Sequence, residues 1–159
     1  MDKHRQVTVD LAGRRAADAR RIVQVPPAHL PLAWPALGPL LAPVVRRSPD
    51  RDARRLRAVL GEGTAQLWMV VEGGVPTAAI VTRLTLGPPK RCLLWLIGGR
   101  GAHAWAGEAV LRIAAWARTW GCVAVWGVGR RGWRRIAAAL GFDRIGDVDG
   151  QQAWERRIA

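Results

Sequence analysis

A glycine-rich segment between a predicted strand and a predicted helix carries the residues best suited to bind a phosphate. Gly98, Gly99 and Gly101 would let the backbone approach a ligand closely, and Arg100 adds a positive charge. Free amide hydrogens and the dipole at a helix N-terminus attract anions. The predicted binding segment comprises Gly98, Gly99, Arg100, Gly101, Ala102, His103, Ala104 and Ala106. A tight turn without a ligand would explain the same glycines.

Arginines form a second candidate anion site further along the chain. Arg130 and Arg131 are followed four residues later by Arg134 and Arg135, so all four project from one broad face of a predicted helix and its entry turn. Arg130 or Arg131 would suit auxiliary contacts to a cofactor phosphate. The alternatives are a surface for nucleic acid or an acidic protein, or a solvated face. No aromatic residue is interleaved with these arginines in a way that suggests base stacking, which argues against a nucleic-acid surface.

Few residues are candidates for proton transfer. Glu72 lies at a predicted turn between strands, and His103 lies at the start of a predicted helix. The helix N-terminus would disfavour protonated His103 and leave a neutral imidazole able to act as a base. Glu62 is a further titratable residue, whereas the predicted strand 91–97 contains no carboxylate. For each candidate, a solvated surface position is the competing interpretation.

The composition indicates one folded domain with an excess of positive charge. The chain has 159 residues and a formal net charge of +13, almost wholly from arginine. This excess favours an anionic partner, although a GC-rich genome would also enrich arginine, alanine, glycine and tryptophan. Cys92 and Cys122 lie in predicted apolar strands without a close-spaced pair, so we expect reduced, buried thiols and no metal site.

No targeting or membrane segment is expected. The first residues lack the continuous apolar stretch of a signal peptide, and no run approaches the roughly 18 apolar residues of a membrane span. We therefore expect a protein of the cytoplasm of a bacterium or of a phage-infected cell.

The hydrophobic pattern alternates between strand and helix periods. Residues 1–20 are expected to form an N-terminal extension, with a short alternating piece at 6–10, and residues 21–159 a single domain. Expected strands span 21–25, 65–71, 76–85, 91–97, 122–128, 143–148 and 153–158. Expected helices span 39–47, where prolines recur every four residues, then 51–60, a segment that begins after Gly98-Gly99 and stops at Gly121, and 132–140.

The stretch from Trp105 to Phe142 resembles the second half of the GNAT N-acetyltransferase superfamily. Its helix, Gly121-Cys122, strand, helix and Gly141-Phe142 follow the order of that family. The resemblance implies an α/β (α+β) fold with a mixed, mostly antiparallel twisted sheet and helices on both faces. It also implies transfer of an acyl group from acetyl-CoA or another acyl-CoA to an amine, with the cofactor pyrophosphate at the loop before the helix.

The residues at the family's chemical positions depart from its pattern. Aligned on Gly121-Cys122, the pyrophosphate motif falls on 101–106, where only Ala106 conforms. Ala104 replaces the central glycine, and Trp105 occupies an aliphatic position. Ala137 replaces the tyrosine that protonates the leaving thiolate, and the chain contains no tyrosine. A methyl group cannot donate a proton.

Two functions follow from these observations. The first is an acyl-CoA-dependent N-acyltransferase acting on an unidentified amine, which requires an open cleft beyond the fourth strand. The second is a catalytically silent phage or prophage protein that binds a macromolecule through basic or tryptophan-rich surfaces. In that second case, Trp105 would fill the cleft where the pantetheine of a cofactor would run.

Overall fold

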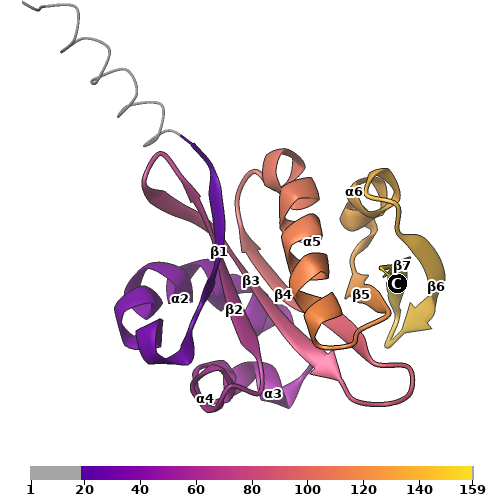
Figure 1. Cartoon of the computed structure of the whole chain (residues 1–159), viewed down its shortest axis with the longest axis horizontal. Coiled ribbons are helices and arrows are strands. Elements are labelled where there is room, and N and C mark those ends of the chain that lie inside the picture. The colour runs from indigo at the N-terminus through magenta and orange to yellow at the C-terminus, as the bar shows by residue number, and fades with distance from the viewer. Residues whose placement is uncertain (1–18, 159) are drawn as a thin grey trace, which may run out of the picture.

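A single seven-stranded sheet forms the centre of the computed structural model, which describes residues 19–158 (Figure 1). The strand order is β1-β2-β3-β4-β5-β7-β6. The strands are β1 (Arg21–Val25), β2 (Gln66–Glu72), β3 (Val75–Thr85), β4 (Arg91–Gly99), β5 (Ala124–Gly129), β6 (Asp143–Val148) and β7 (Gln151–Arg157). All seven expected strands are present. The predicted strand piece at 6–10 lies outside the described residues.

One pair of strands in the sheet is parallel. β4 and β5 run in the same direction, and the other neighbouring pairs are antiparallel. Two parallel neighbours need a crossover connection. Here the crossover is α5 (Ala102–Thr119), whose buried stripe includes Val110, Ile113, Ala114 and Ala117.

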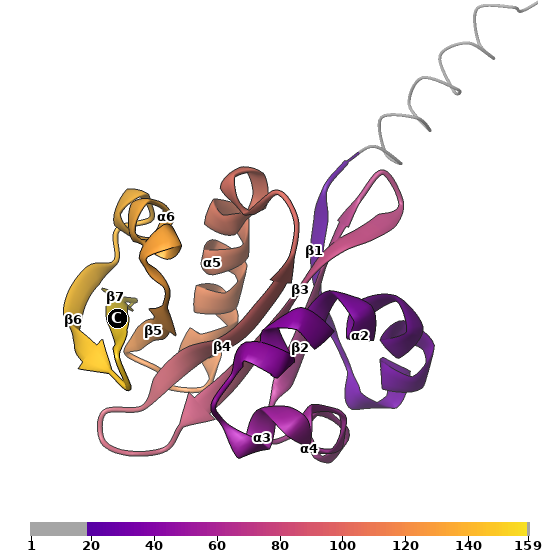
Figure 2. The same cartoon turned by 180° about the vertical axis from the view of Figure 1, so that it is seen from behind.

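Helices cover both faces of the sheet, as Figures 1 and 2 show from opposite sides. On one face, α5 and α6 (Arg134–Ala139) pack in a cluster with residues such as Ile80 and Val125. On the other face, α2 (Leu30–Arg47), α3 (Arg51–Arg54) and α4 (Leu56–Glu62) contribute to a second cluster that contains Val81. Short 3-10 turns, η1 (Pro27–His29) and η2 (Arg131–Trp133), precede α2 and α6. This is the mixed, mostly antiparallel architecture that the resemblance implied.

α2 begins nine residues earlier than the sequence pattern predicted. Pro35, Pro39 and Pro43 lie inside the helix, where each removes one backbone donor. Pro35 and Pro39 lie on the exposed side of the helix. The opposite side of the helix buries Leu37 and Leu41 completely. Burial of this apolar side stabilises the longer helix, an effect that the proline spacing alone does not reveal.

The segment containing α2 is also more apolar than expected. Pro27–Arg47 is long enough to cross a membrane and contains an 18-residue window with a mean hydropathy of 1.3, contrary to the expectation that no segment would qualify. Length and composition alone are weak evidence for a span. In the structure, Leu30, Leu37 and Leu41 pack in the core beneath the sheet.

The predicted second helix forms as two pieces. Asp50 caps α3 through its side chain, whose Oδ1 accepts a hydrogen bond from the Asp52 amide at 2.9 Å. The backbone leaves the helical conformation at Arg55, and α4 then continues to a left-handed Gly63, two residues beyond the predicted end. The break at Arg55 has no turn signal in the sequence.

Candidate functional site

A cleft opens where β4 and β5 separate. The two strands pair from Arg91 opposite Ala124 to Leu94 opposite Gly127, and no further. Trp95 has no partner on β3, because Val81 is opposite Leu96 and Thr82 is opposite Leu94. An unpaired extra residue of this kind bends a strand and increases its twist. The bulge at Trp95 therefore lies at the point where β4 diverges from β5.

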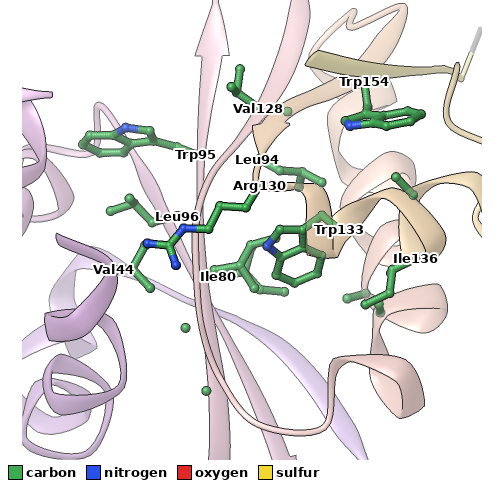
Figure 3. A pocket seen from close by; sticks show the side chains of 18 of the residues that line it. Val44, Ile80, Leu94, Trp95, Leu96, Val128, Arg130, Trp133, Ile136 and Trp154 are labelled. Carbon is green, nitrogen blue, oxygen red and sulfur yellow. The ribbon is translucent and has the colours of Figure 1, made fainter. Parts of the chain in front are cut away.

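The cleft contains a cavity of about 560 Å³, whose wall comes from both faces of the sheet. α2 contributes Val44 and Arg47, and α5 contributes Ala106 and Ala109. Figure 3 shows the side chains that line it, with Trp133 and Ile136 on the side of α6. Because residues of both faces reach the same space, ligands could approach one another through the gap between the strands.

Trp105 belongs to the wall of the cleft and does not fill it. Its side chain is only 2% exposed, and its Nε1 donates to the Arg100 carbonyl oxygen at 2.8 Å. This hydrogen bond ties the first turn of α5 to the loop before it. The cavity remains open beside the ring. Trp105 therefore does not block the cleft between β4 and β5.

Packing requires Gly98 and Gly99, which the sequence placed in a loop but which are the last two residues of β4. A Cβ atom on Gly98 would lie 2.2 Å from the Leu40 carbonyl oxygen of α2, and one on Gly99 would lie 2.4 Å from the Thr77 carbonyl oxygen of β3. Gly101 differs, because nothing crowds it within 3.9 Å and its φ of +76° is the feature that favours glycine. Gly98 and Gly99 therefore need no bound ligand to explain them.

The first turn of α5 offers backbone donors. The Ala104 amide donates to the Gly101 carbonyl oxygen at 2.9 Å, while those of Ala102 and His103 have no acceptor among residues 19–158. The initial amides of a helix lack intrahelical acceptors. Arg100 is exposed beside them. Free donors, a neighbouring cation and an open cleft make a site that fits a phosphorylated cofactor.

The predicted site residues divide into two groups around this cleft. Those in the cavity wall are Gly98, Gly99, Ala106 and Arg130. Those of the described chain that lie outside the wall are Glu72, Arg100, Gly101, Ala102, His103, Ala104 and Arg131. Several of the second group belong to the first turn of α5, where phosphates rather than an acyl group would be expected.

Glu72 takes part in an ion-pair network at the edge of the loop. Arg20 Nε lies 2.7 Å from Glu72 Oε1, and its Nη1 donates to the Ala104 carbonyl oxygen at 2.8 Å. Glu108 lies 3.8 Å from the same guanidinium. This arrangement links the end of β2 to α5 and holds the Glu72 carboxylate away from the cavity lining.

Trp154 is a lining residue that the sequence pattern did not suggest. It lies on β7, is 9% exposed, and its Nε1 is buried without a hydrogen-bond partner in the described structure. Figure 3 places its ring above the cavity, opposite Trp133. A buried indole that lacks a partner is costly, so it is a potential donor to a ligand. Its position on a late strand with no adjacent motif gave no sequence signal.

The two cysteines do not supply a nucleophile. Both are free and buried. Burial is the larger cause, and the neighbouring Cys122 the smaller cause, that raises the pKa of the Cys92 thiol to about 12. Burial also raises the pKa of Cys122. Thiols with raised pKa values remain protonated near neutral pH and react slowly. In the described part of the chain, no cluster of three histidine, cysteine or acidic residues is arranged to hold a metal.

Comparison with known proteins identifies structural relatives. No protein-family model matches the sequence, and no curated protein matches it significantly. An N-acetyltransferase from Staphylococcus aureus superposes with a TM-score of 0.65 at 12% identity, over 88% of this chain and 98% of that one. The PaiA N-acetyltransferase of Thermoplasma acidophilum in complex with coenzyme A gives 0.63 at 9% identity, over 87% and 99%.

A GNAT-family acetyltransferase from Listeria monocytogenes gives a TM-score of 0.61 at 10% identity, over 87% of this chain and 94% of that one. Identities this low establish the fold alone. The likeness nevertheless spans almost the whole of each relative. The described chain therefore has the fold of the GNAT acetyltransferases.

Proposed function

We propose that this protein is an acyl-CoA-dependent N-acyltransferase. The observation that carries the proposal is the open cavity between β4 and β5, next to the N-terminus of α5. Ligand sites are typically concave and mostly apolar, with a few polar groups that fix orientation. The cavity has this character, and residues from the helices on both faces of the sheet line it. Acetyl-CoA or a related thioester is the proposed donor, and an amine is the proposed acceptor.

The loop before α5 is the proposed site for the cofactor pyrophosphate. The amides of Ala102 and His103 would donate to it, and Arg100 would add a positive charge. Arg131 is exposed and would act as an auxiliary phosphate contact. When bound, the cofactor would supply a thioester whose carbonyl carbon an amine can attack. The apolar wall around Ala106 and Ala109 would exclude water from that group.

The described residues provide no ordinary acid or base at the cavity. Arginines are the only ionisable residues in its wall, and Ala137 lies where the family resemblance expects a tyrosine. His103 is exposed outside it, and Glu72 is paired with Arg20. Catalysis would then depend mainly on holding the thioester and a neutral amine together, with water or substrate carrying protons. Correct positioning can contribute about 7–11 kcal/mol in intramolecular reactions.

Calorimetric titration with acetyl-CoA tests this proposal. Ala137→Trp would place a large ring in the cavity, whereas Ala138→Trp adds the same ring at an exposed position outside the wall. We expect binding by the unmodified protein and Ala138→Trp, and binding weakened at least tenfold in Ala137→Trp. Circular dichroism would verify that both variants fold. No heat of binding for the unmodified protein at millimolar acetyl-CoA would reject the function.

One observation favours a second candidate function, the binding of a polyanion such as nucleic acid. Arg131, Arg134 and Arg135 are exposed, and none forms an ion pair with another described residue. Phosphate-directed binding weakens steeply with salt. Titration of a labelled DNA duplex at two salt concentrations, with Arg134→Gln and Arg135→Gln compared, would detect it. Equal binding by the variants would remove this candidate.

A further inference from the structure

The charged residues of the cavity wall are all positive. Arg47 and Arg130 line the cavity, and the described wall contains no aspartate or glutamate. Most of the remaining wall is apolar, including Val44, Leu96 and Ile136. Both arginines are exposed residues, and their like charges attract an anion and repel a cation. The site therefore favours an anionic group and disfavours a polycation.

The described carboxylates leave these two arginines unneutralised. Glu72 and Glu108 lie beside Arg20, and the other ion-paired carboxylates, Asp52, Asp147 and Glu155, bind Arg83, Arg144 and Arg91. No ion pair or side-chain hydrogen bond within residues 19–158 involves Arg47 or Arg130. Among the described residues, none competes with a ligand for either guanidinium group.

Their position separates them from the proposed pyrophosphate site. Arg47 is the last residue of α2, on the face of the sheet opposite to α5. Figure 3 shows the Arg130 side chain extended across the cavity from the end of β5 toward the side where Val44 of α2 lies. Both therefore face the part of the cleft that remains for the acceptor when phosphates occupy the first turn of α5.

We propose that the amine acceptor carries a carboxylate, which Arg47 and Arg130 bind, attached to an apolar body. This inference rests on the proposed acyl transfer and specifies its substrate class. Arginine binds carboxylates through directed, charge-assisted hydrogen bonds, and the apolar wall suits an aliphatic or aromatic side chain. An apolar amino acid has this combination of groups. A polyamine lacks the carboxylate and would place positive charge beside two arginines.

A pair of product-like probes tests the inference without requiring turnover. N-acetyl-L-phenylalanine and N-acetyl-L-phenylalaninamide differ in one group, which is a carboxylate in the first and a neutral amide in the second. Dissociation constants would be measured by tryptophan fluorescence, since Trp95, Trp105 and Trp133 line the cavity. The proteins compared are the unmodified chain, Arg47→Gln, Arg130→Gln and the control Arg46→Gln, which removes an exposed charge one residue outside the wall.

We expect the acid to bind the unmodified chain and Arg46→Gln at least about tenfold more tightly than the amide, a difference of ~1.4 kcal/mol. In Arg47→Gln and Arg130→Gln, the preference should fall below about threefold. Equal binding of acid and amide, or no binding of either at millimolar concentration, overturns the inference. An equal loss of preference in Arg46→Gln also overturns it, because the effect would then be one of net charge.

Titration with acetyl-CoA separates this inference from the proposed function. Affinity for acetyl-CoA should be retained in Arg47→Gln and Arg130→Gln. If both variants lose acetyl-CoA binding while acid and amide bind alike, the arginines contact cofactor phosphates and the inference fails. If acetyl-CoA does not bind any protein but the acid preference depends on both arginines, the acyltransferase function fails while a carboxylate site remains.

Discussion

Substitution of Gly98 by alanine tests whether the glycines at the end of β4 serve packing. The added Cβ would lie 2.2 Å from the Leu40 carbonyl oxygen and 2.9 Å from its carbon. Real Cβ atoms essentially never approach closer than 3.0 Å, so α2 or β4 would have to move by about 0.8 Å. The contacting atoms are backbone, which cannot rotate away as a side chain can. Moving α2 would also loosen Leu37 and Leu41, which are completely buried.

Overpacking of this kind costs about 1–3 kcal/mol of the free energy of unfolding. Gly132→Ala is the matched control, because nothing lies within 4 Å of its added Cβ and its backbone is not left-handed. We expect that control to change stability by less than about 0.5 kcal/mol. Urea unfolding followed by tryptophan fluorescence measures both. If Gly98→Ala and Gly132→Ala unfold at the same urea concentration, the close approach of α2 to β4 is wrong.

Three further perturbations have defined outcomes. Ala137→Tyr should increase kcat for acyl transfer at least ~10-fold over Ala137→Phe by supplying a proton donor, and equal rates would show that protonation of the thiolate does not limit turnover. The pKa of Cys92 is raised from 9.0 to about 12, so the folded state holds this thiol's proton more tightly than the unfolded state does. The resulting contribution to the free energy of unfolding is complete below pH 9 and is lost as the pH rises toward 12. Cys92→Ala should flatten that decline in the unfolding free energy, measured by urea titration at each pH. Asp50→Ala should cost roughly 0.5–2 kcal/mol in the same assay by removing the α3 cap, and no change would show that the cap is dispensable.

The outline of the fold was accessible from local patterns. Alternating apolar residues and the turns at Gly73-Gly74 and Gly87-Pro88 predicted β2, β3 and β4. The stripe through Val110, Ile113 and Ala117 predicted the crossover helix. α2 was predicted too short. The proline spacing is visible in the local sequence, whereas the burial of Leu37 and Leu41 that stabilises the helix depends on tertiary contacts.

The site was predictable only in part. The segment Gly98–Gly101 was expected to lie between a strand and a helix, but Gly98 and Gly99 are the last residues of β4, and only Arg100 and Gly101 connect β4 to α5. Gly98 and Gly99 are explained by Leu40 and Thr77, residues far away in the sequence. The sequence did not decide whether Trp105 blocks the cleft. In the structure, its ring donates a hydrogen bond to the Arg100 carbonyl oxygen and forms part of the cavity wall. Arg47 and Trp154 had no motif to mark them.

The sequence by itself determined the order of strands and helices, the absence of a tyrosine at position 137, and the excess of arginine. These are properties of residue type and short-range spacing, which a single segment displays. Only the tertiary structure decided that β4 leaves β5 after Leu94, that a cavity opens there, and that its charged wall residues are Arg47 and Arg130. These features depend on contacts between segments distant in the sequence, and no local pattern encodes them individually.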